Sequence, residues 1–140
     1  MGFWKKLLGG ESGSVDYYRE GVELLRAGNY HEALTSFRLA LRDAPLDPAV
    51  LQQMAITYTR IGMTDEAART YRIVLSSHPG AAGAHYGLAF LLLREGRLQE
   101  AEHHLRAFLD APPAGAEAQQ HVAHARAALA ELGVVPQPEP

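Results

Sequence analysis

The 140-residue sequence has no cysteine, no long apolar run and no large excess of charge of one sign. Without cysteine it can form no disulfide, no thiolate metal site and no thiol nucleophile. No apolar stretch approaches the roughly 18 residues that a membrane-spanning helix needs. A net charge of −3 argues against the clustered basic face of a nucleic-acid-binding protein, so we expect no nucleic-acid partner.

Motifs of common catalytic sites are also missing. The sequence has no Gly-rich phosphate loop, no GxSxG elbow, no HExxH motif and no framework of paired carboxylates. Four histidines on two predicted helices are the remaining metal candidates: His103, His104, His121 and His124. Because no cysteine and no metal-binding motif accompany them, a solvated polar face is the favoured interpretation. We therefore predict no enzyme, no cofactor and no metal site.

The sequence does contain a 34-residue repeat. Four columns recur at this spacing in three copies: Gly28, Gly62 and Gly96; Ala33, Ala67 and Ala101; Phe37, Tyr71 and Leu105; Pro45, Pro79 and Pro113. Glycine just past a helix takes a left-handed cap without Cβ strain. Alanine suits a close crossing of two helices, the larger residue four positions on shares its face, and proline stops the second helix. Each unit is therefore predicted to be a helix, a tight turn, a second helix and a short link.

The repeat predicts an all-α chain with helices over residues 15–27, 30–43, 48–61, 64–76, 82–94, 98–110 and 116–132. Capping residues support three of the starts. Ser14 can cap the first helix. Asn29, with Glu32 three residues later, has the spacing of a capping box. Asp47 before Pro48 has the pattern of an N-cap followed by proline in the first turn.

These columns resemble the tetratricopeptide repeat (TPR) family, as do the small residues inside the first helix of each pair: Gly21, Ala55 and Ala89. The resemblance covers about residues 14–115. It implies a right-handed superhelical array of three TPR helix-turn-helix hairpins. The sequence departs from the family where an early tryptophan is replaced by Tyr17, Leu51 and His85. Phe108 stands in a column that the family usually fills with alanine.

The repeat also predicts how the chain is divided. The predicted parts are an amphipathic segment and Gly/Ser linker (1–13), three repeats over 14–115 (14–47, 48–81 and 82–115), a C-terminal capping helix (116–132) and a Pro-rich tail (133–140). Apolar residues recur at helical spacing in the capping helix: Ala118, Val122, Ala125, Leu129 and Leu132. We expect this face to cover the core edge of the last repeat, as open arrays require.

In TPR proteins the first helix of each pair lines a concave groove, and its outward residues contact the ligand. Transferred position by position, the resemblance implies three rungs of partner-binding residues. The first rung is Tyr18, Val22, Leu25 and Arg26; the second is Gln52, Ile56, Thr59 and Arg60; the third is Tyr86, Phe90, Leu93 and Arg94.

Two rows run through these rungs. The basic row, Arg26, Arg60 and Arg94, could pair with acidic groups of a partner. It could equally be the family's usual charge at the negative end of a helix. The apolar row, Val22, Ile56 and Phe90, is either an exposed stripe that marks a binding site or packing between neighbouring repeats.

The N-terminal segment has an amphipathic pattern of its own. Its apolar side chains are Phe3, Trp4, Leu7 and Leu8. So short a helix is not stable alone in water, so the segment needs a surface if it is to fold. A membrane, a partner protein, and the groove of the same or a neighbouring copy are open interpretations, as is plain disorder.

These features predict a cytoplasmic protein–protein interaction scaffold or adaptor without a cofactor. Its groove would bind a short acidic or amphipathic peptide segment of a partner. The alternative is a structural self-assembly unit, in which residues 3–8 of one copy fill the groove of the next. If the N-terminal segment binds lipid, the protein is peripheral to the inner face of the membrane.

Overall fold

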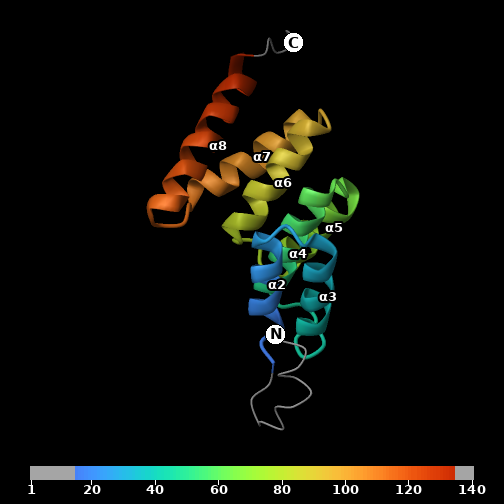
Figure 1. Ribbon diagram of the computed structural model, residues 1–140. Helices are drawn as coiled ribbons and strands as arrows, with labels where there is room; N and C mark the ends of the chain where they lie inside the picture. The colour runs from blue at the N-terminus through green and yellow to red at the C-terminus, as the bar shows by residue number, and fades with distance from the viewer. Residues whose placement is uncertain (1–14, 135–140) are drawn as a thin grey trace. The chain divides into compact units, whose positions relative to one another are not determined.

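A computed structural model describes residues 15–134 of the chain (Figure 1). Those residues contain seven helices and no strand: α2 (Tyr17–Arg26), α3 (Tyr30–Ala40), α4 (Pro48–Ile61), α5 (Thr64–Ser77), α6 (Ala82–Arg94), α7 (Leu98–Asp110) and α8 (Ala116–Val134). The predicted all-α helical repeat array is confirmed. The bounds predicted for α4, α6 and α7 coincide with those observed, and α3 ends three residues earlier than predicted.

The packing divides the described residues into two compact units, which meet between Met63 and Thr64 in the sequence. In the first unit, α2 and α3 form a hairpin, and α4 packs against α3 and touches α2. In the second unit, α5 packs against α6, α6 and α7 form a hairpin, and α8 packs against α7. The division falls inside residues 48–81, so the compact units and the predicted 34-residue repeats are different divisions of the chain.

The repeated glycines end the first helix of each pair as predicted. Gly28, Gly62 and Gly96 have φ angles of +82°, +94° and +76°, which is the left-handed region. The residue after each glycine donates a backbone hydrogen bond to the carbonyl five positions before it, at 2.8–2.9 Å. This pattern satisfies carbonyl groups that the helix end would otherwise leave without a donor. It also turns the chain sharply enough for the next helix to begin within two residues.

The alanine and aromatic columns form the core. Ala33, Ala67 and Ala101 are fully buried, and the residues four positions later are buried beside them: Phe37, Tyr71 and Leu105. Burial raises the pKa of the Tyr71 hydroxyl to about 12, so that side chain is neutral at physiological pH. The columns therefore mark helix-crossing points, as the sequence predicts.

The helix starts differ in part from the prediction. Asp16 caps α2, because its side chain accepts a hydrogen bond from Arg19 N at 3.0 Å; Ser14 lies outside the described residues. The capping box at Asn29 is wrong, because the Asn29 side chain makes no capping hydrogen bond. The Asp47 prediction is confirmed: its Oδ1 accepts from Ala49 N at 2.9 Å.

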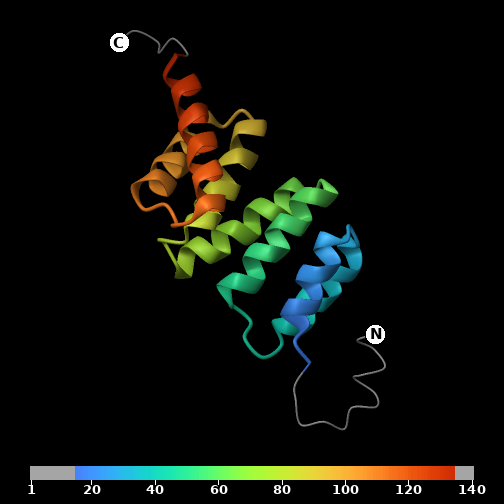
Figure 2. The same ribbon diagram turned by 60° about the vertical axis from the view of Figure 1, so that its left-hand side comes forward.

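The last helix, α8, packs its apolar face onto the α6–α7 hairpin. Figures 1 and 2 both show α8 beside this hairpin. Val122 and Ala125 of α8 join a buried cluster with Leu105 and Phe108 of α7. Leu129 and Leu132 of α8 are partly buried against the same cluster. None of the helices α2 to α8 is both long and apolar enough to cross a membrane.

Candidate binding surface

The first predicted rung lies on α2. Tyr18 and Val22 are half-buried, whereas Arg26 in the last turn is exposed. One side of the Tyr18 ring faces the core, with its centroid 6.3 Å from that of Phe37. The helix can sit this close to Phe37 because Gly21 has no side chain at the crossing. The rung therefore presents apolar side chains that the core covers only in part.

The second rung lies on α4, which touches α2 within the first unit. Gln52 and Ile56 are half-buried and Arg60 is exposed. This arrangement repeats that of the first rung, on the first helix of the next repeat. The structure thus brings the first two rungs onto contacting helices of one compact unit.

The third rung lies on α6 in the second unit, where α8 covers part of it. The Tyr86 hydroxyl lies 2.8 Å from His124 Nδ1, and burial raises the Tyr86 pKa, so the neutral hydroxyl can donate to that nitrogen. The Phe90 and His124 rings are stacked, with centroids 4.2 Å apart and planes 14° from parallel. The Tyr86 ring also lies 4.6 Å from that of His121. These contacts were not predicted from the sequence.

His124 has the register of a fourth rung. It follows Phe90 by 34 residues, as Phe90 follows Ile56 and Ile56 follows Val22. The core face of α8 keeps the same register, because Val122 follows the buried Leu88 by 34 residues and is itself buried. Extending the repeat spacing past residue 115 would have identified His124. The signal was hidden because no second helix follows in the pattern.

The basic row differs from other arginines in its contacts. Within residues 15–134, Arg26, Arg60 and Arg94 form no ion pair. Five other arginines do: Arg19, Arg69, Arg72, Arg97 and Arg106. Each residue of the basic row is exposed in the last turn of its helix. Their charges are therefore available to an external anion.

The histidines considered as metal ligands fall into two separate places. His104 contacts His85 of α6, with 2.9 Å between their Nδ1 atoms, while His121 and His124 lie beside Tyr86. In the described part of the chain, no group of three or more His, Cys, Asp or Glu side chains is placed to hold a metal ion. The predicted N-terminal anchor residues Phe3, Trp4, Leu7 and Leu8 lie outside that part.

The resemblance carried by the repeated columns is confirmed by a match to a protein-family model. The profile described as Tetratricopeptide repeat matches residues 18–51 and 53–116. The chain belongs to the tetratricopeptide repeat family. In this TPR protein, the match ends where α8 begins, so it covers the three predicted hairpins and not the closing helix. Comparison with curated protein sequences gives no significant match.

Solved TPR structures share this fold at low sequence identity. One is the type III secretion chaperone SycD of Yersinia enterocolitica, in complex with a peptide of the translocator YopD: 18% identity, 84% of this chain, 90% of that chain and a TM-score of 0.77. Another is PcrH in complex with the chaperone-binding region of PopD. It is 18% identical, the match covers 88% of this chain and 96% of that chain, and the TM-score is 0.75. PcrH has also been solved from Pseudomonas aeruginosa. A third is the first TPR of Spaghetti (RPAP3), bound to the HSP90 peptide SRMEEVD. It is 19% identical, the match covers 81% of this chain and 90% of that chain, and the TM-score is 0.69.

Proposed function

We propose that this TPR protein is an interaction scaffold or adaptor that binds a short acidic or amphipathic peptide segment of a partner protein. The observation that carries the proposal is the combination on each rung of a half-exposed apolar side chain with an arginine that has no ion-pair partner among the described residues. Such a surface complements a peptide with alternating apolar and acidic side chains. Guanidinium groups favour carboxylates because they can bond them bidentately.

Similar proteins supply independent support. Three of the structures with this fold were determined with a peptide or binding region of another protein. The HSP90 peptide SRMEEVD mixes acidic with apolar residues, as the proposed ligand does. These likenesses support a peptide-binding role, and the apolar and basic side chains on this chain's rungs favour an acidic or amphipathic peptide as the ligand.

Selection from a random peptide library displayed on phage tests the ligand class directly. With the intact chain as bait, we expect recovered peptides to be enriched in Asp and Glu together with apolar residues. Recovered peptides with no acidic bias would remove the anion-binding part of the proposal. Recovery of no peptides, together with concentration-dependent growth in light scattering, would favour the self-assembly alternative instead.

Charge reversal of the basic row is expected to weaken a selected peptide at least about tenfold, because hydrogen bonds to charged groups contribute about 1.5–3 kcal/mol each. The variant is Arg26→Glu with Arg60→Glu and Arg94→Glu, measured by isothermal titration calorimetry at two salt concentrations. A matched control reverses Arg38, Arg42 and Arg126, which also form no ion pair within residues 15–134. Equal affinity and equal salt dependence in both triple variants would show that the basic row does not contact the ligand.

The apolar row is best tested at Val22 and Ile56, because its third member, Phe90, is stacked on His124 of α8. The double variant Val22→Ser with Ile56→Ser is expected to bind the same peptide with about tenfold lower affinity, because each change removes roughly 1 kcal/mol or more of apolar contact. Ile73→Ser is the control, since Ile73 is a 38% exposed apolar residue of α5 and belongs to none of the three rungs. Circular dichroism melting confirms that each variant folds. Unchanged affinity in the double variant would assign the apolar row to packing.

A further inference from the structure

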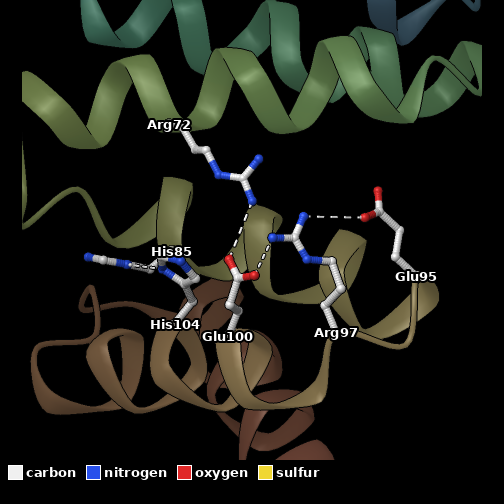
Figure 3. A network of polar contacts seen from close by, with 6 residues as sticks. All are labelled: Arg72, His85, Glu95, Arg97, Glu100 and His104. Atoms are coloured by element: carbon white, nitrogen blue, oxygen red, sulfur yellow. Dashed lines mark hydrogen bonds and ion pairs between the residues drawn. The ribbon is translucent and has the colours of Figure 1, made fainter.

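A chain of hydrogen bonds connects three segments of the second unit through two histidines. His85 of α6 is buried, with 8% of its surface exposed, and His104 of α7 is half-buried. Their Nδ1 atoms are 2.9 Å apart. His85 Nε2 lies 2.7 Å from the carbonyl oxygen of Pro79, in the link between α5 and α6. Figure 3 shows the two rings facing each other beside the neighbouring ion pairs.

The Pro79 carbonyl determines which nitrogen carries each proton. A carbonyl oxygen can only accept a hydrogen bond, so His85 donates from Nε2. Neutral His85 then has a lone pair at Nδ1, and His104 donates to it from its own Nδ1–H. The two imidazoles are therefore opposite neutral tautomers. Together they fasten the α5–α6 link, α6 and α7 to one another.

Acid disrupts this arrangement in two steps. One extra proton, on either ring, still allows one Nδ1 atom to donate and the other to accept, because the remaining neutral ring can hold its own proton on either nitrogen. Only when both rings carry an extra proton do both Nδ1 atoms bear an N–H. Two donors cannot bond each other, and two positive rings in contact within a partly buried site repel strongly. The doubly protonated pair cannot keep the neutral geometry.

The surroundings of His104 disfavour its protonation. The charged and titratable groups around it are Arg72 on α5, His85 on α6, and Glu100 and His103 on α7. Glu100 is the one acidic group of this set, and Arg72 at 3.5 Å and Arg97 both pair with it (Figure 3). Burial is the largest cause that lowers the pKa of His104 to about 4; His85, His103 and Arg72 act in the same direction, and Glu100 opposes them.

We propose that the His85–His104 pair is an acid-sensitive lock on the α6–α7 hairpin, closed when both rings are neutral and open when both are protonated. The inference does not depend on peptide binding. The unfolded chain protonates His104 near pH 6.5, well above the folded chain, so the unfolded state binds more protons between pH 6.5 and about 4. The contribution of this histidine to stability is therefore full above about pH 6.5 and is lost as the pH falls toward 4.

Imidazole ¹⁵N spectra of the full chain test the hydrogen-bond chain itself. At pH 7.5 we expect His85 protonated on Nε2 and His104 on Nδ1, the tautomer that free histidine adopts less often. On titration, the His104 signals should not shift until the pH falls below about 5. Two Nε2–H tautomers, or a His104 that titrates near pH 6.5, would overturn the proposal even if no variant folds.

Thermal unfolding at pH 7.5 and pH 5.0 tests the lock. His104→Asn keeps an N–H where Nδ1–H was but cannot be protonated. We expect wild type to lose at least about 5 °C more of its melting temperature on acidification than this variant does, which corresponds to a change of roughly 1–2 kcal/mol. His31→Asn, which removes an exposed histidine of α3, should behave as wild type. Equal losses in wild type and His104→Asn would contradict the lock.

Discussion

Replacement of Phe108 by alanine is expected to lower the free energy of unfolding by about 3–5 kcal/mol, the range for deleting a buried phenylalanine. The family resemblance alone would predict that alanine is tolerated here without loss of stability, because alanine is the usual residue in this column. In this chain the Phe108 side chain is 2% exposed, and its ring centroid lies 5.1 Å from that of Tyr86. It also joins Val122 and Ala125 of α8 in one cluster. The substitution would leave a cavity beneath the closing helix.

Urea unfolding followed by circular dichroism measures this loss. Phe90→Ala serves as the comparison, because Phe90 is half-exposed and its ring is stacked on that of His124 of α8. Its loss should be clearly smaller than that of Phe108→Ala. A Phe108→Ala protein as stable as wild type would show that α8 and Tyr86 do not pack on this ring.

Replacement of Gly87 by alanine is expected to lower the free energy of unfolding by a net of about 2 kcal/mol. This is the reverse of the usual effect, because glycine inside a helix is normally less stable than alanine. A Cβ at position 87 would overlap the Tyr71 ring, coming to 2.7 Å from Cε2 and closer to the Cζ and hydroxyl atoms. Tyr71 is 4% exposed and cannot easily move aside. Overpacking of this kind costs roughly 1–3 kcal/mol, and here the upper end outweighs a helix-propensity gain of about 1 kcal/mol.

Two further variants isolate the cause. Gly133→Ala lies in α8 with no heavy atom within 4 Å of the added Cβ, so it should not destabilise the chain. Tyr71→Leu removes the ring atoms that clash, and the same column is filled by Leu105 in the next copy. When Gly87→Ala is combined with Tyr71→Leu, it should therefore lower the free energy of unfolding much less than it does in the wild-type chain. Additive losses in urea unfolding would rule out the steric explanation.

The repeated columns made most of the fold predictable. Glycine, alanine and proline act through backbone conformation and close approach, which depend little on distant residues. That is why the end of α4 could be predicted from Gly62, and the helix-crossing point on α5 from Ala67, without knowledge of the rest of the fold. Residue type and spacing were not enough at Asn29, whose side chain makes no capping hydrogen bond even though asparagine is a preferred N-cap residue.

The candidate surface was less predictable than the fold. The rungs follow from register, but how far α8 covers Phe90 depends on packing between helices that no local pattern encodes. The contact between His85 and His104 was missed for a related reason. The residues lie 19 positions apart, and their hydrogen bond requires two particular tautomers as well as proximity. Histidine in the family's tryptophan column was the one sequence signal that pointed there.

The register of α8 has a consequence for how such chains change in length. Because His124 and Val122 continue the 34-residue spacing, α8 already meets the preceding hairpin as the first helix of another unit would. A duplicated segment encoding a second helix could follow residue 134 without creating a new kind of interface. Gain or loss of whole units is then a small genetic step, and the number of rungs available to a ligand can evolve independently of the chemistry on each rung.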